Sequence, residues 1–232
     1  FVDPEAESDP KSKLNLMIDD VIAAYKAGAD VEFTKDGKVV PGRGNTMMVF
    51  SDLGFGKGVT ERRGFNARAW FEKRLRDAGV APNHVAFMSD YKKSSAKADL
   101  FRDMNNGKVR ILVGSSKNMG TGVNAQQRLR TLFHLDSPWY PSDLEQREGR
   151  IIRAGNMNKT VEVRAYSTKG TYDEVMWKML ANKQRFINQA LSGDASVRRI
   201  EDLDSQSDFE ILSALVAEDP RIMQMAGLQG DI

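Results

Sequence analysis

Five short segments rich in β-forming residues recur through the middle of the chain, and this recurrence constrains the fold more than any other feature. The expected strands are residues 46–51, 84–89, 109–115, 130–136 and 160–167. The expected helices between them are residues 64–78, 92–105, 123–128 and 141–153. Strands that alternate with helices favour a parallel sheet covered on both faces. We therefore predict a doubly wound α/β lobe.

Further elements are predicted on either side of this alternation. Apolar residues from Leu14 to Ile22 recur at intervals of three and four, which predicts an amphipathic helix. An Asp-Gly pair within residues 35–39 predicts a β-hairpin. Thr171 followed by Glu174 has the spacing of a capping box, so a second long helix is expected to begin there.

A chain of 232 residues has room for one large domain with appendages. We interpret residues 1–13 as a linker and residues 14–190 as the α/β lobe, with residues 29–45 as an insertion. Residues 191–232 are expected to form a helical extension that continues into a downstream region.

Composition excludes several classes of protein. The chain has no cysteine and only two histidines, so disulfides and thiolate metal sites are ruled out and we expect no metal. No apolar run approaches the ~18 residues that a membrane helix needs. We expect a cytoplasmic protein without a membrane partner.

Net charge is only +2, but a basic stretch runs from Lys57 to Asp77 and includes Arg62 and Arg63. Such a stretch can attract a phosphate backbone. A solvated amphipathic helix has the same appearance. Both interpretations stay open from the sequence.

A polar segment follows the fourth expected strand and carries Gln146, Arg150 and Arg153. Arginine keeps its charge at any working pH and offers a rigid fork of donors that fits a phosphoryl oxygen. A spacing of three would place both arginines on one helix face. Ser142 with Glu145 predicts the start of that helix by a capping box. Taken alone, the arginines favour a solvated basic helix face that pairs with Glu145 and Glu148.

The order of these residues, after a glycine run, closely resembles motifs V and VI of superfamily-two helicases of the Swi/Snf DNA-translocase type. The matching residues are Gly120, Gly122, Asn124, Asp136, Trp139, Pro141, Gln146, Arg150, Arg153 and Gly155. Met119 stands where the family has a glycine, and Asn156 where it has a glutamine. The resemblance spans roughly residues 12–190.

The resemblance implies a RecA-like lobe and a role for each matched position. Arg150 and Arg153 would be catalytic arginine fingers. The implied ATP-facing residues are Gly120, Gly122, Asn124 and Gln146. The implied nucleic-acid contacts are Ser51, Ser115, Ser116, Arg62 and Arg63. The implied partner is DNA, with a duplex favoured over a single strand.

A phosphate-binding loop, G-x-x-x-x-G-K-[ST], is missing from the sequence, because in residues 54–60 Lys57 is followed by Gly58. An acidic metal-binding pair after a strand is missing too. The resemblance therefore implies that a separate N-terminal RecA-like lobe of the same protein holds most of the ATP and Mg. This chain alone would be inactive as an ATP hydrolase.

Residues 207–225 resemble the segment that follows the helicase lobe in large phage and mobile-element proteins, where a Swi/Snf-like motor is joined to a DNA methylase. A methylase domain is thus a possible partner within the parent chain. The alternative function is a non-catalytic RecA-like module that docks nucleic acid or protein. A different doubly wound fold with coincidental glycines is the other alternative.

Overall fold

The computed structural model describes residues 9–35, 37–52, 55, 65–119 and 122–192. The chain divides into two compact units, the first comprising Phe1–Asp136 and Asp143–Tyr166 and the second Ser137–Ser142 and Ser167–Ile232. The first unit holds the sheet and its covering helices. The second holds the long helix α6, Tyr172–Ser192.

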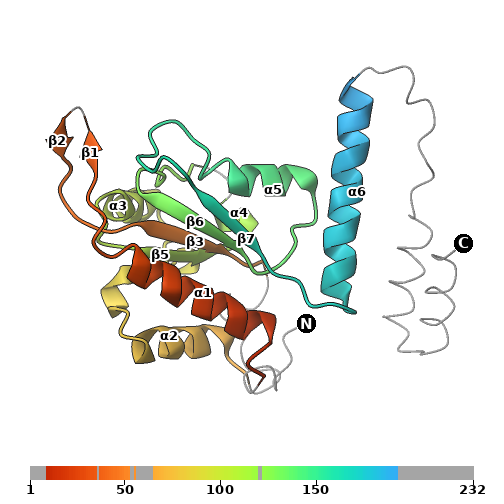
Figure 1. Cartoon of the computed structure of the whole chain (residues 1–232), viewed down its shortest axis with the longest axis horizontal. Coiled ribbons are helices and arrows are strands. Elements are labelled where there is room, and N and C mark those ends of the chain that lie inside the picture. Colours follow the sequence, from red (N-terminus) through yellow and green to blue (C-terminus); the bar gives the residue numbers. More distant parts are fainter. Residues whose placement is uncertain (1–8, 36, 53–54, 56–64, 120–121, 193–232) are drawn as a thin grey trace, which may run out of the picture. The chain divides into compact units, whose positions relative to one another are not determined.

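A five-stranded parallel sheet forms the centre of the first unit (Figure 1). Its strands are β3 Thr46–Phe50, β4 Val85–Phe87, β5 Ile111–Gly114, β6 Leu129–His134 and β7 Glu162–Ala165. Their order across the sheet is β4-β5-β3-β6-β7. All five expected strands and the doubly wound α/β prediction are confirmed.

Helices cover both faces of the sheet (Figure 1). The helices are α1 Lys13–Ala27, α2 Ala67–Asp77, α3 Ser94–Asn105, α4 Ser116–Met119 and α5 Pro141–Glu148, with short 3-10 turns η1 Pro82–His84 and η2 Met88–Asp90. On β3, Met47 and Val49 pack in the core with residues of α1 and α2. Met48 and Phe50 pack on the opposite face, with residues of α3 and α4. This alternation follows from the two-residue period of a strand, and burial on both faces accounts for the uninterrupted apolar run.

The flanking predictions are confirmed in outline. α1 begins after Ser12, whose hydroxyl accepts from the Asn15 amide at 3.3 Å. The predicted hairpin is formed by β1 Thr34–Lys35 and β2 Lys38–Val39. α6 begins directly after Thr171, but the Glu174 carboxylate accepts from the Gly170 amide at 2.6 Å instead of closing a box on Thr171.

One helix prediction is wrong, and a second is right in its position but wrong in its cap and its end. Residues 123–128 contain no helix: Val123 and Ala125 are buried while Asn124 between them is exposed, as in an extended segment. The other helix, α5, begins at Pro141, so Ser142 lies inside it and cannot be its N-cap. Proline suits the first helical position because its missing amide hydrogen would have no partner there.

α5 also ends at Glu148, five residues before the predicted end at residue 153. The amide of Ile151 bonds to the carbonyl of Glu148 at 3.0 Å, a spacing of three residues that marks a turn. The predicted linker and C-terminal extension fall largely outside the described residues, and the proposed bounds of the lobe stay a prediction.

Candidate functional site

The carboxyl ends of β3 and β6 lie side by side at the point where the chain connections diverge. From β3 the chain continues through α2 to β4 on one side of the sheet order, and from β6 through α5 to β7 on the other. Ligands of doubly wound sheets bind in the crevice at such a switch point. Asp52 follows β3 and Asp136 follows β6, so both carboxylates stand at this crevice.

Arg147 on α5 joins the ends of three strands. Its side chain is 1% exposed. The Nη2 atom lies 2.8 Å from Oδ2 of Asp52, and Nη1 donates to the main-chain oxygen of Asp136 at 3.0 Å. The Nε atom donates to Oγ of Ser116, beyond β5, at 2.8 Å. One rigid fork thus fixes α5 to the segments that follow β3, β5 and β6.

The two carboxylates are held by further hydrogen bonds. Oδ2 of Asp136 accepts from Oγ of Ser51 at 2.9 Å and from the Asp52 amide at 2.8 Å. Asp52 accepts from the amide of Ser116 at 2.6 Å and from its hydroxyl at 3.0 Å. Burial raises the pKa of Asp136 in spite of the nearby Arg147 charge. We call Ser51, Asp52, Ser116, Asp136 and Arg147 the strand-end network.

His134, the last residue of β6, lies under this network and is 1% exposed. Burial, and secondarily the positive charge of Arg147, lowers its pKa to about 3. His134 is therefore neutral at physiological pH. It is a structural histidine of the interior.

Arg150 and Arg153 converge on one acceptor. Nη1 of Arg150 lies 3.5 Å from the main-chain oxygen of Val123, and Nη1 of Arg153 lies 3.3 Å from the same atom. Both follow the end of α5, so the predicted shared helix face is wrong and the turn at Gly149 brings them together instead. Burial, and then the charge of Arg153, lowers the pKa of Arg150. Two adjacent guanidinium groups fit an anionic ligand such as a phosphate.

The other predicted ATP-facing residues are Gly120, Gly122, Asn124 and Gln146. Gln126, which is not one of these predicted residues, is buried and donates to the carbonyl of Ala154 at 3.2 Å, so it ties the segment before β6 to the segment that follows Arg153. Gly122 has φ of 72°, a left-handed conformation that favours glycine. Asn124 and Gln146 are exposed. Gly120 lies outside the described residues.

The predicted nucleic-acid contacts divide into three groups. Ser51 is only 4% exposed and its hydroxyl donates to Asp136, so its position corrects the prediction that it contacts nucleic acid. Ser115 and Ser116 are partly exposed just beyond β5. The Ser116 hydroxyl hydrogen is used on Asp52, which leaves Ser115 the better donor to a phosphate. Arg62 and Arg63 lie outside the described residues.

Sequence reasoning missed Asp52 and Arg147. Pro141, Arg147 and Ile151 are the buried positions of this segment. An arginine on an otherwise inward-facing stripe indicates a buried ionic partner, because an unpaired buried charge is costly. That signal was available in the sequence, whereas the identity of the partner was not.

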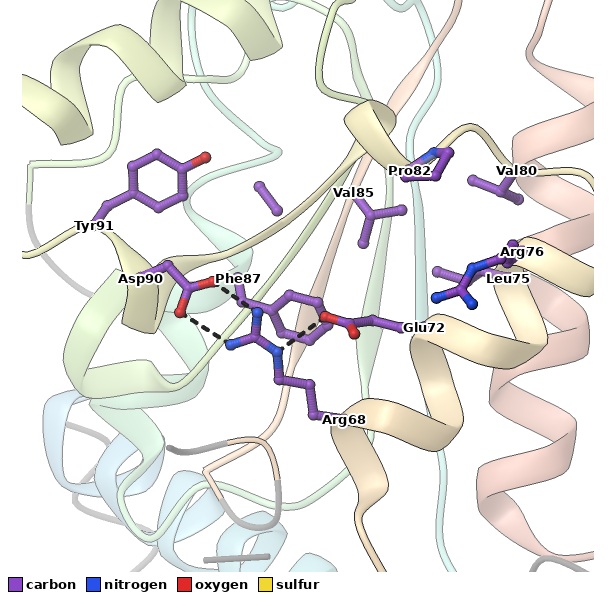
Figure 2. Close-up of a pocket in the computed structure, with 11 residues that line it drawn as sticks. Arg68, Glu72, Leu75, Arg76, Val80, Pro82, Val85, Phe87, Asp90 and Tyr91 are labelled. Atoms are coloured by element: carbon purple, nitrogen blue, oxygen red, sulfur yellow. Dashed lines mark hydrogen bonds and ion pairs between the residues drawn. The ribbon is translucent and has the colours of Figure 1, made fainter. Parts of the chain in front are cut away.

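A pocket of about 270 Å³ lies elsewhere on the lobe, between α2 and the edge strand β4 (Figure 2). Arg68 donates to Asp90 at 2.7 Å and to Glu72 at 3.0 Å, and its guanidinium lies 4.0 Å from the centre of the Phe87 ring. These charged groups satisfy one another. None of the predicted site residues lines this pocket, so the strand-end crevice is the better candidate site.

Two features are absent from the described part of the chain. No cluster of three or more histidine, cysteine, aspartate or glutamate residues there could hold a metal ion. No helix within the described ranges is both long enough and apolar enough to cross a bilayer.

A five-stranded parallel sheet with helices on both faces defines a RecA-like α/β lobe. Residues 66–155 match the family described as helicase conserved C-terminal domain. This match, together with relatives of the Swi/Snf group, supports a C-terminal superfamily-two helicase lobe in this chain.

Relatives of known name agree with this assignment. The chain is 28% identical over 157 residues to "Defense against restriction protein B" of Escherichia phage P1, covering 68% of this chain and 7% of the relative. It is 33% identical over 114 residues to "Uncharacterized ATP-dependent helicase YqhH" of Bacillus subtilis (strain 168), covering 49% and 19%. It is 39% identical over 99 residues to "DNA repair protein RAD5A" of Arabidopsis thaliana, covering 42% and 9%. The chain spans less than a fifth of the length of each.

Among solved structures, the chain is similar to the C-terminal part of the Fun30 ATPase domain, at 18% identity and a TM-score of 0.46 over 59% of this chain and 39% of that one. The DUF1998 helicase MrfA bound to DNA is also similar, at 9% identity and a TM-score of 0.48 over 77% and 21%.

Proposed function

We propose that this chain is the second motor lobe of an ATP-dependent DNA translocase or helicase. The observation that carries the proposal is the convergence of Arg150 and Arg153 on the oxygen of Val123. Two guanidinium groups that meet at one main-chain oxygen can turn together toward a phosphate presented from outside the lobe. The first lobe would supply the phosphate loop and the Mg site.

The chain's own residues have a limited set of tasks in this scheme. Arg150 and Arg153 bind phosphoryl oxygens and stabilise the charge that develops on them. Gln146, exposed near the end of α5, can donate to the same ligand. Bound ATP would supply the phosphoryl group whose hydrolysis drives stepping. Gly122, in its left-handed conformation, lets the main chain turn close to the arginines.

The nucleic-acid side of the proposal rests on the hydroxyl-bearing turn beyond β5. Ser115 and Ser116 are small and partly exposed, and they lie beside α4. Small hydroxyl groups approach a phosphate closely without reading bases, so binding would be independent of sequence. Arg62 and Arg63 would add positive charge that attracts the DNA phosphates. We favour duplex DNA as the track.

The alternative is a docking module that binds nucleic acid or protein without ATP. A docking module has no need for two guanidinium groups that converge on one main-chain oxygen. Burial, and then the charge of Arg153, lowers the pKa of Arg150, and an anion bound beside both arginines would offset both effects. The convergence is accounted for by an anionic ligand. It therefore favours the motor over the docking module.

The test uses the full-length protein that carries this chain. ATP turnover is measured with and without duplex DNA, and displacement of a third strand from a triplex reports translocation. DNA-stimulated turnover with displacement supports the motor. DNA binding with no stimulated turnover at saturating ATP supports the docking module.

Two finer proposals concern the setting of the motor. A methylase domain in the same protein is suggested by residues 207–225, which lie outside the described part of the structure. The absence of cysteine fits a reducing compartment that contains DNA, such as the cytoplasm of a bacterial cell. The sequence of the full-length protein tests for the methylase domain. Cell fractionation tests the compartment.

A further inference from the structure

The strand-end network contains a side chain that touches both halves of the proposed site. Arg147 donates through Nε to Ser116, in the turn proposed to meet DNA. Its main-chain oxygen accepts from the Arg150 amide at 3.2 Å, at the start of the turn that carries both fingers. A continuous set of hydrogen bonds thus runs from Ser116 through Arg147 to Arg150.

We propose that Arg147, held by Asp52, is a positioning residue that couples the Ser115–Ser116 turn to the finger segment, so that DNA on one side changes the placement of Arg150 and Arg153 on the other. This inference rests on the proposed motor function. It adds a role for Arg147 and Asp52, which are not among the residues proposed to contact ATP or DNA.

The geometry supports coupling over simple anchoring. Ser116 donates its amide and its hydroxyl to Asp52 and accepts from Arg147, so all three groups move as one unit. The planar guanidinium uses three nitrogens in fixed directions on three partners. A displacement of Ser116 therefore forces Arg147 either to follow or to break a hydrogen bond. Since Arg147 is the last residue but one of α5, following means moving the start of the finger turn.

Stability alone gives a poor reason for this arrangement. A buried ion pair loses much of its Coulomb energy to desolvation, and apolar replacements of similar volume are often as stable. Burial raises the pKa of Asp136 even with Arg147 beside it, which shows that the desolvation cost is felt at this site. A directional, charged connection is what coupling requires.

Arg128 provides a matched control at the opposite end of β6. It is also fully buried, with 0% exposure. Its Nε donates to the carbonyl of Asn105 at 2.8 Å and its Nη2 to the carbonyl of Pro41 at 2.7 Å. Arg128 immediately precedes β6, whereas Arg147 contacts the residue two beyond the end of that strand. Replacing each arginine by lysine removes the fork and keeps the charge.

The experiment compares Arg147→Lys, Arg128→Lys and Asp52→Asn in the full-length protein. The readouts are kcat with and without duplex DNA, KM for ATP, and the melting temperature. We expect Arg147→Lys and Asp52→Asn to lower the ratio of DNA-stimulated to basal kcat by about tenfold, with little change in KM. Arg128→Lys should lower the melting temperature to a similar extent and leave that ratio within about twofold of wild type.

If DNA stimulates the wild type, an equal ratio of DNA-stimulated to basal kcat in Arg147→Lys and Arg128→Lys would overturn the inference. The proposed motor function would stand. A wild type without stimulation would refute the motor itself. If Arg147→Lys does not fold, Asp52→Asn decides: an unchanged ratio overturns the coupling. Amide exchange at Ser116 adds an independent readout, since its amide donates to Asp52, and faster exchange in Arg147→Lys than in Arg128→Lys is expected.

Discussion

Arg150 and Arg153 share one hydrogen-bond acceptor, the main-chain oxygen of Val123, at 3.5 and 3.3 Å from their respective Nη1 atoms. Val123 follows the glycine run, so the two motifs that the sequence presents separately meet at this oxygen. A bound phosphate would compete with that oxygen for the same donors. In the proposed motor, binding of nucleotide would therefore affect the main chain at Val123.

The first prediction concerns these two fingers. In the full-length protein, Arg150→Ala or Arg153→Lys should lower kcat by about 10³ or more with near-normal DNA binding, because the lost contact belongs mainly to the transition state. Steady-state turnover at saturating duplex DNA measures the effect. Arg102→Ala is the control, since Arg102 is 67% exposed and pairs with Asp99 on the surface. If both finger variants keep the wild-type kcat, the two arginines are not catalytic and belong to a solvated basic surface.

The second prediction is that this chain alone hydrolyses ATP negligibly. Its sequence carries neither a phosphate-binding loop nor an acidic metal pair, and both groups are needed for phosphoryl transfer in motors of this class. Phosphate release from the purified chain, with and without DNA, measures this. Robust turnover that disappears in Arg150→Ala would show that the chain forms a complete site.

The third prediction concerns the DNA track. Replacing Arg62 and Arg63 together by alanine should reduce the slope of log K against log salt by roughly one to two units, because each neutralised phosphate releases counterions. Ser115→Ala should weaken binding with little change in slope, since a hydroxyl carries no charge. Fluorescence anisotropy of labelled duplex DNA at several salt concentrations measures both.

Lys35 and Lys38 on the β1–β2 hairpin are the control for this charge effect, because both are exposed and lie on the predicted insertion. Their double replacement by alanine removes the same charge as the arginine pair. A slope that changes equally in both double variants would indicate a general charge effect. A slope unchanged in the arginine pair would place the DNA path elsewhere.

The fourth prediction concerns pH and His134. Its folded pKa of about 3 lies below the unfolded value of 6.5, so the unfolded state binds more protons and stability falls as pH drops below 6.5. At pH 5 the loss is about 2 kcal/mol relative to pH 8. Asp136 acts in the opposite sense, since its raised pKa favours the folded state as it becomes protonated.

Urea unfolding of the chain at pH 8 and pH 5 tests this linkage. His134→Gln removes the titrating group, and the variant should lose less stability than wild type over the same pH interval. An equal loss in both proteins would assign the acid sensitivity to other groups.

Local pattern was sufficient for the strands and for the first helix. The strand from Thr46 to Phe50 is apolar throughout because both of its faces are buried, and α1 has the three-and-four spacing of a helix with one buried side. Pattern failed where tertiary contacts outweigh local preference. The sequence predicts a helix over residues 123–128, yet Val123 and Ala125 pack in the core as part of an extended segment.

The sequence by itself determined the order of elements, the parallel sheet and the family to which its motifs belong, because these depend on periodicity and on short-range spacing. Only the tertiary structure decided which polar groups meet. Arg147 and Asp52 are 95 residues apart and come together because β3 lies between β5 and β6. Arg150 and Arg153 converge through a turn and not through a helix face. Strand order and turn geometry depend on contacts between distant segments, which local spacing does not encode.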